Sequence, residues 1–264
     1  MMSRTLRLSD GLTVRVIEGG AGAPVLLIHG VGLRAEVWAP QMAALSSGNR
    51  VIAVDMPGHG DSDPLPGVPD LPDYVAWAAR VVEALALGPV AVAGHSMGAL
   101  IAGGLAVDRP DLVARAALLN GVHRRDDAAR QAVLARAAEI AAGGGSIEGP
   151  LARWFSDDQV ALRNQVAGWL RSVPTGGYAA AYRAFAGGDA WYADRLGEIR
   201  CPLLVLTGDG DANSTPSMTQ AMADMAPLGR AVVIPGHRHM VSMTAPAAVT
   251  AELHRWLSTK EIAA

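Results

Sequence analysis

Residues 90–100 read VAVAGHSMGAL, a short apolar run that stops at Gly94, presents Ser96 and passes Gly98 before a helix of small residues begins. A strand that turns this abruptly into a helix puts the serine in a strained backbone conformation, and side chains larger than hydrogen two residues to either side would collide with it. The pattern predicts a serine presented at the carboxyl edge of a sheet, where ligands bind in such folds. A glycine-flanked turn in which Ser96 only caps the helix is the alternative.

Similar apolar runs recur along the chain and alternate with helical patterns. The other expected strands read LTVRVIE (12–18), PVLLIHG (24–30), RVIAVDM (50–56), ARAALLN (114–120), PLLVLTG (202–208) and AVVIPG (231–236). Short apolar runs of this kind suit strands that are buried on both faces. Helical spacing is found in residues 71–88, around Met218–Met225 and in residues 246–257. Strands alternating with helices predict an α/β fold with a mostly parallel, doubly wound sheet.

Composition limits the partners that we expect. The chain has 264 residues, half of them apolar, and a formal charge of −3. We expect no nucleic-acid partner because the chain carries no net positive charge. We expect no membrane partner because no apolar run approaches the roughly 20 residues that cross a bilayer. The first residues lack the pattern of a signal peptide, so a cytoplasmic location is the default expectation. The single cysteine, Cys201, cannot form an internal disulfide and is given no chemical role.

Between Val122 and about Ile199 the strand pattern disappears, and the sequence becomes helical and rich in alanine. We expect residues 1–121 and 199–264 to form the α/β core and residues 122–198 to form an inserted helical lid. Eight of the twelve aromatic residues fall in this segment: Trp154, Phe155, Trp169, Tyr178, Tyr182, Phe185, Trp191 and Tyr192. Because a small lid has little core of its own, these side chains either pack it onto the core or line the gap between them.

Acidic and basic candidates follow two late strands. The run LLVLTGDGDANSTP supplies Asp209 and Asp211, and the run VVIPGHRHMVSMTAP supplies His237 and His239. A serine hydroxyl is a poor nucleophile until an imidazole takes its proton, and the imidazole needs a carboxylate to fix its tautomer. The order serine, acid, histidine, together with the glycine-flanked serine turn, resembles the α/β-hydrolase family along nearly the whole chain. The resemblance implies the α/β-hydrolase fold.

The resemblance also implies which acid and which histidine are used. In the family the acid lies three residues beyond the strand-ending glycine and a few before a proline, which selects Asp211 and leaves Asp209 as a turn residue. The family histidine is followed by an apolar residue and, seven positions on, by the proline that opens the last helix. His239 matches this pattern and His237 does not. The implied catalytic triad is Ser96, His239 and Asp211.

Two backbone donors for an oxyanion are implied as well. In VLLIHGVGLRAEVW the amide after His-Gly belongs to Val31, and the amide after the nucleophile belongs to Met97. Only these N–H groups matter, so the side chains carry little information. Other polar residues of this loop and of the family signature DMPGHGDSD are expected to organise the structure: His29, Asp55, His59 and Asp61.

The lid offers a narrower resemblance. LARWFSDDQVALRNQV followed by GYAAAYRAFAGGD is similar to the lid of 3-oxoadipate enol-lactonases and nearby small-ester hydrolases. Candidate substrate contacts are His95, Trp154, Tyr178 and Met240, although His95 could equally pack beneath the serine turn. Enol-lactone relatives act on substrates with a carboxylate, which would need a cation. The cations available by sequence, each of which also suits a solvated surface, are Arg124, Arg125, Arg153 and Arg183.

We therefore expect a serine hydrolase that cleaves a small carboxylic ester or lactone through an acyl-enzyme, with no cofactor and no metal. Two other classes fit the same residues. One is a related enzyme that uses this frame for carbon–carbon cleavage, lysis, perhydrolysis or cofactor-free dioxygenase chemistry; the other is a small-molecule receptor that retains the triad. Metal hydrolysis has little support, because HRH (237–239) comes without an HExxH helix or paired CxxC motifs.

Overall fold

The computed structural model describes residues 1–259, and across them eight strands form one sheet. In spatial order the strands are β1 (Met2–Arg7), β2 (Thr13–Gly19), β4 (Asn49–Val54), β3 (Ala23–Ile28), β5 (Val90–His95), β6 (Val113–Leu119), β7 (Leu203–Gly208) and β8 (Gly229–Ile234). β2 pairs antiparallel with β1 and β4, and the other pairings described are parallel. The predicted mostly parallel α/β sheet is confirmed.

The central strands come from apolar runs that are buried on both faces. Every residue of β5 and of β7 is buried, which explains why these strands read as continuous apolar runs without alternation. β1 is not among the strands that the sequence predicts. Its sequence, MSRTLR, lies at the sheet edge and has a single buried residue, Leu6, so it carries almost no apolar pattern.

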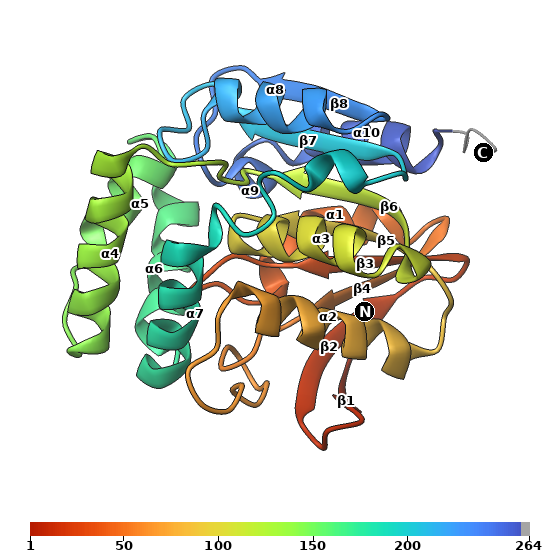
Figure 1. Cartoon of the computed structure of the whole chain (residues 1–264), viewed down its shortest axis with the longest axis horizontal. Helices are drawn as coiled ribbons and strands as arrows, with labels where there is room; N and C mark the ends of the chain where they lie inside the picture. Colours follow the sequence, from red (N-terminus) through yellow and green to blue (C-terminus); the bar gives the residue numbers. More distant parts are fainter. Residues whose placement is uncertain (260–264) are drawn as a thin grey trace.

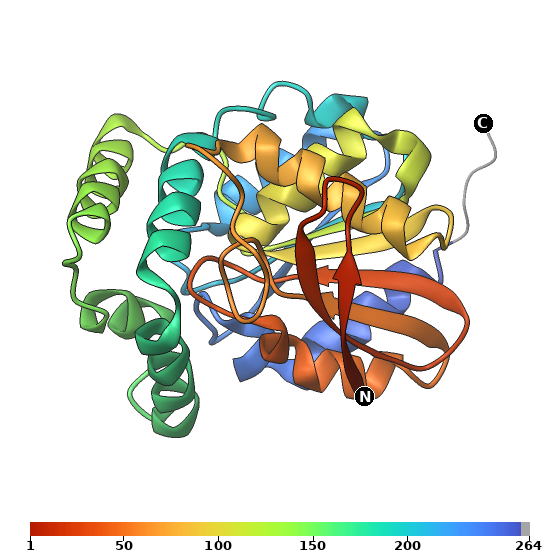
Figure 2. The same cartoon turned by 90° about the horizontal axis from the view of Figure 1, so that it is seen from below.

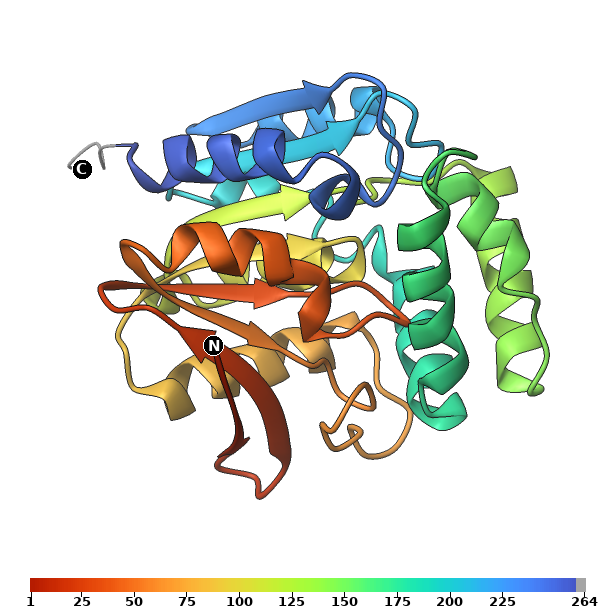
Figure 3. The same cartoon turned by 180° about the vertical axis from the view of Figure 1, so that it is seen from behind.

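Helices cover both faces of the sheet. α1 (Ala39–Leu45) and α10 (Pro246–Leu257) pack together on one face, which is in front in Figure 3. α2 (Leu71–Leu85), α3 (Met97–Asp108) and α8 (Pro216–Met225) cover the opposite face, which is in front in Figure 1. No helix within the described chain has the length and apolar character needed to span a membrane.

α3 lies close to its neighbours because small residues form much of it. Ten of its twelve residues are buried. A Cβ at Gly104 would come within 2.6 Å of Val75 on α2 and within 2.7 Å of Tyr192, so only glycine fits there without a shift. α3 also packs against β5 and β6, which holds the residues at its N-terminal end close to the sheet.

Residues 122–198, which we call the cap, connect β6 to β7 through four helices lying beyond the carboxyl ends of the parallel strands (Figures 2 and 3). They are α4 (Asp127–Ala141), α5 (Glu148–Trp154), α6 (Val160–Ser172) and α7 (Thr175–Gly188). α4 packs along α7. The shorter helices of the described chain are η1 (Ala35–Trp38), η2 (Pro110–Leu112), η3 (Leu196–Glu198) and α9 (Val241–Thr244).

Candidate active site

Ser96 lies at the turn between β5 and α3, with φ 56° and ψ −116°. A positive φ is uncommon for residues other than glycine, so the turn holds the serine in a strained conformation, as its sequence predicts. The Ser96 amide donates to Leu119 O on β6 at 2.9 Å. The Ser96 side chain makes no capping hydrogen bond to the described backbone of α3, which argues against the capping alternative.

Three glycines allow separate backbone segments to meet at this turn. A Cβ at Gly94 would overlap the carbonyl oxygen of Gly98, and a Cβ at Gly98 would overlap the carbonyl oxygen of Ile28. A Cβ at Gly30 would lie 2.9 Å from Ser96 Cβ. The loop after β3 therefore lies directly against the serine.

Gly98→Ala is expected to lower the free energy of unfolding by about 2 kcal/mol and to abolish most activity, because the added methyl group meets backbone atoms that cannot move aside. Gly103→Ala, on the same helix, is the matched control. Its Cβ would lie 3.6 Å from the nearest atom, in Leu118, which is an ordinary contact. Urea unfolding of both variants checks the difference, and equal stability would contradict this account of the turn.

His239 and Asp211 form a buried hydrogen-bonded pair. His239 Nδ1 lies 2.8 Å from Asp211 Oδ2, and because a carboxylate accepts, Nδ1 donates and Nε2 is left as the basic nitrogen. Asp211 Oδ1 accepts from the amides of Asn213 and Ser214 at 2.8 and 3.1 Å. Burial pushes the pKa of Asp211 upward, but His239 and the hydrogen-bond donors outweigh burial and hold the pKa below its ordinary value. Asp211 is therefore ionised at neutral pH.

Asn120 supports the carboxylate and was not among the residues that the sequence singles out. It directly follows β6 in a left-handed conformation with φ 51°, and it is fully buried. Asn120 Nδ2 donates to Asp211 Oδ2 at 2.8 Å and to Thr207 Oγ1 at 3.1 Å. The sequence feature that could have identified Asn120 is its place at the carboxyl end of a predicted strand, where polar side chains of neighbouring strands converge.

Ser96 and His239 line one cavity of about 230 Å³ between the core and the cap. Val31 lines it from the loop after β3. The Trp154 ring stacks on His239, with ring centroids 5.6 Å apart and an interplanar angle of 30°. The cap residues that line the cavity include Arg125, Asp126, Arg153, Trp154, Tyr182 and Phe185.

Arg238 links the histidine loop to the cap. Its Nη1 donates to Ala152 O at 2.8 Å and to Phe155 O at 2.7 Å. These two carbonyl groups flank Trp154 at the end of α5. The same contact that docks the cap therefore holds Trp154 beside His239.

Val31 and Met97 present backbone amides next to the serine turn. Val31 follows Gly30, which lies against Ser96, and Met97 is the first residue of α3. Among residues 1–259, neither amide donates a hydrogen bond. Free donors of this kind, one of them at the positive end of a helix, suit a developing negative charge.

Residues 25–253 match the sequence profile of the Alpha/beta hydrolase family. The chain belongs to this family. The match spans both flanks of the cap and all the residues of the serine, acid and histidine loops described above, and it confirms the predicted fold and family.

Two relatives and one solved structure illustrate the likeness. The (E)-2-((N-methylformamido)methylene)succinate hydrolase of Acinetobacter baylyi is 49% identical over 261 residues, which cover 98% of this chain and 99% of that protein. The 2-(acetamidomethylene)succinate hydrolase of Mesorhizobium japonicum is 27% identical over 246 residues, covering 89% of this chain and 88% of that protein. The enol-lactonase structure from Burkholderia xenovorans has a TM-score of 0.89 at 23% identity, covering 97% and 100% of the two chains, and shows the shared fold.

In this alpha/beta hydrolase, three of the four predicted substrate contacts lie outside the cavity lining, which corrects the prediction. His95 is fully buried beneath the serine turn, where its Nε2 donates to His239 O at 2.9 Å. Met240 is fully buried as well. Tyr178 is buried against the loop that follows β3. Trp154 is the predicted contact that lines the cavity.

The second acid and the second histidine belong to the turns around the site. Asp209 Oδ1 accepts from the Gly236 amide at 2.8 Å. His237 Nδ1 lies 3.0 Å from Thr244 Oγ1. Neither residue is in the cavity lining. The structure thus brings Asp211 and His239 together and leaves the alternative pair apart.

His29 and His59 organise the loops of this hydrolase, as the sequence predicts. His29 Nε2 accepts from the Met56 amide at 2.9 Å while Nδ1 donates to Gly30 O at 2.7 Å. His59 Nε2 accepts from the Gly32 amide at 3.0 Å. Burial lowers the pKa of His29 to about 4 and that of His59 to about 3, so both rings stay neutral. Their ring nitrogens are already engaged with backbone, which leaves them unsuited to act as the base.

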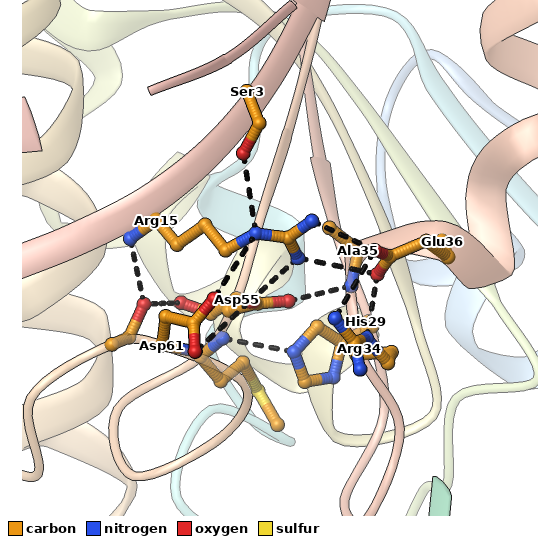
Figure 4. Close-up of polar contacts among 10 residues, drawn as sticks. Ser3, Arg15, His29, Arg34, Ala35, Glu36, Asp55 and Asp61 are labelled. Atoms are coloured by element: carbon orange, nitrogen blue, oxygen red, sulfur yellow. Dashed lines mark hydrogen bonds and ion pairs between the residues drawn. The ribbon is translucent and has the colours of Figure 1, made fainter. Parts of the chain in front are cut away.

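Asp55 organises the same region through charge. Its Oδ1 accepts from the Ala35 amide at 2.7 Å, and its Oδ2 accepts from Arg15 Nη1 at 3.0 Å (Figure 4). Asp61 joins this network at its exposed edge, with Oδ2 3.6 Å from Arg15 Nε. The network holds η1 and the loop after β4 together, close behind the loop that carries Val31.

Proposed function

We propose that this chain is a serine hydrolase in which Ser96 is the nucleophile, His239 the general base and Asp211 the acid that orients His239. The observation that carries the proposal is that Ser96 and His239 line one cavity while His239 Nδ1 is hydrogen-bonded to Asp211. A neutral imidazole held in this tautomer can take the serine proton, and the carboxylate stabilises the imidazolium that forms. The free amides of Val31 and Met97 are the proposed oxyanion donors.

The proposed reaction proceeds through an acyl-enzyme. Ser96 Oγ attacks the substrate carbonyl carbon as its proton passes to His239 Nε2. The bond to the leaving group breaks, the leaving oxygen or nitrogen takes the proton from His239, and the acyl group stays on Ser96. Water then gives a proton to His239 as its oxygen attacks the carbonyl carbon of this ester. The bond from that carbon to Ser96 Oγ breaks, Oγ takes the proton back from His239, and a carboxylic acid is released. These steps need no cofactor.

We infer that the substrate is a small acyl compound that carries carboxylates. Two relatives, one of them 49% identical, are named as hydrolases of amidomethylene succinates, in which nitrogen takes the place of the ester oxygen expected from the sequence. Arg125 and Arg153 supply cations in the cavity wall. The cavity of about 230 Å³ is smaller than the ~300–1,000 Å³ of common small-molecule sites. The first compound to test is (E)-2-((N-methylformamido)methylene)succinate.

A series of p-nitrophenyl esters with acyl chains of about two to twelve carbons tests the size of the site. We expect kcat/KM to fall by about tenfold or more between four and twelve carbons, because the aromatic wall from Trp154, Tyr182 and Phe185 leaves no room for a long chain. A steady rise toward twelve carbons would contradict this inference. Absence of turnover with every ester and with the succinate compound would contradict the hydrolase proposal itself.

A further inference from the structure

Arg125 is a buried cation in the wall of the cavity. Its side chain is 4% exposed, and Cζ lies 4.4 Å from the ring centroid of Phe185, which lines the same cavity. Nη1 is engaged at the end of α7, 3.1 Å from Asp189 Oδ1 and donating to Phe185 O at 3.3 Å. Nη2 is also buried and has no hydrogen-bond partner within residues 1–259. A buried donor without a partner is costly, so the guanidinium group keeps hydrogen-bonding capacity that the surrounding protein does not satisfy.

Asp189 positions Arg125 but does not cancel the positive charge around it. Asp189 is buried, its Oδ2 accepts from the Arg125 amide at 2.6 Å, and Arg130 lies 3.3 Å from both carboxylate oxygens. One carboxylate between two guanidinium groups leaves a net positive charge. The cavity wall adds exposed Arg153, and exposed Asp126 opposes it from the N-cap of α4. The net positive charge of these groups favours the binding of an anion in the cavity.

We propose that the guanidinium group of Arg125 recognises a carboxylate of the substrate, with Asp189 and Phe185 as positioning residues. The proposal rests on the proposed function, because the carboxylate belongs to the compound whose carbonyl Ser96 attacks. A carboxylate oxygen in the plane of the guanidinium forms a strong charge-assisted hydrogen bond, which an apolar group of the same shape cannot form. Arg125 therefore discriminates between charged and neutral acyl groups of equal size.

Two esters of matched shape test this inference. Mono-4-nitrophenyl succinate carries a carboxylate at the end of its acyl chain, and 4-nitrophenyl 4-methylpentanoate replaces the two carboxylate oxygens with methyl groups. We expect the wild-type protein to prefer the succinyl ester. Arg125→Met should lower kcat/KM for that ester by about 10- to 100-fold, mainly through KM, and change it for the neutral ester by less than about threefold.

Arg124→Met is the control for removing a neighbouring arginine. Arg124 is exposed, pairs with Asp194 and does not line the cavity, so this variant should leave the ratio of the two kcat/KM values unchanged. Arg125→Lys keeps the charge beside Asp189 but lacks the second nitrogen, and it should lower the ratio as well. Should Arg125→Met fail to fold, as judged by circular dichroism, Arg125→Lys decides the question by the same ratio.

The two proposals fail in different ways. If the wild-type protein hydrolyses neither ester nor the succinate compound, the proposed hydrolase function is overturned. If it hydrolyses the neutral ester but the ratio is the same in wild type and both Arg125 variants, the assignment of Arg125 is overturned while the hydrolase function stands. A parallel loss on both esters also overturns the assignment, because a structural defect affects them equally.

Discussion

Ser96→Ala is expected to lower kcat/KM by about 10⁴- to 10⁶-fold in a protein that otherwise folds normally. The expected loss is this large because the other members of the site act through the serine, and without its oxygen no acyl-enzyme forms. Steady-state hydrolysis of a short p-nitrophenyl ester measures the effect, with circular dichroism to verify folding. Ser258→Ala, which changes an exposed serine at the end of α10, is the control and should retain full activity.

A Ser96→Ala variant that retains most of its turnover would contradict the proposed mechanism. The remaining chemistry would then depend on His239 and Asp211 without a covalent step. That outcome favours the alternative class predicted from the sequence, in which the same frame supports cofactor-free reactions.

His239→Ala is expected to lose about 10⁴- to 10⁶-fold in rate, while His237→Ala keeps most of its activity. The two residues are two positions apart, yet only His239 is bonded to Asp211 and lines the cavity. Comparing the two variants on the same ester separates a catalytic role from a general effect of changing this loop. The reverse result, an active His239→Ala and an inactive His237→Ala, would show that the loop register is different.

The fold could be predicted where strands are buried on both faces and helices have one apolar face. β5 and β7 could be predicted because each is a continuous apolar run. The serine turn between β5 and α3 could be predicted because two glycines flank the serine and small residues follow it. β1 could not be predicted in this way, since an edge strand with one buried residue is stabilised by pairing with β2 rather than by burial.

The pair of Asp211 and His239 could be predicted because the sequence resembles the α/β-hydrolase family, whose pattern places the acid and the histidine relative to a glycine and a proline that this chain also has. The cavity wall could not be assigned in the same way. Tyr178 and Tyr182 lie one turn apart on α7, and only the placement of the cap helices on the core decides that Tyr182 meets the cavity. The position of Arg125 in the cavity wall likewise depends on its contact with Asp189, which lies 64 residues away in sequence. Such long-range contacts leave no local pattern.

Intact-mass spectrometry after treatment with a fluorophosphonate tests the central claim most directly, because it detects the activated serine whatever the natural substrate is. The wild-type protein should gain a single adduct, peptide mapping should place it on Ser96, and esterase activity should disappear in proportion to labelling. His239→Ala should label far more slowly, since the hydroxyl has lost its base. An adduct on another residue, or full activity in protein whose Ser96 is labelled, would contradict the account.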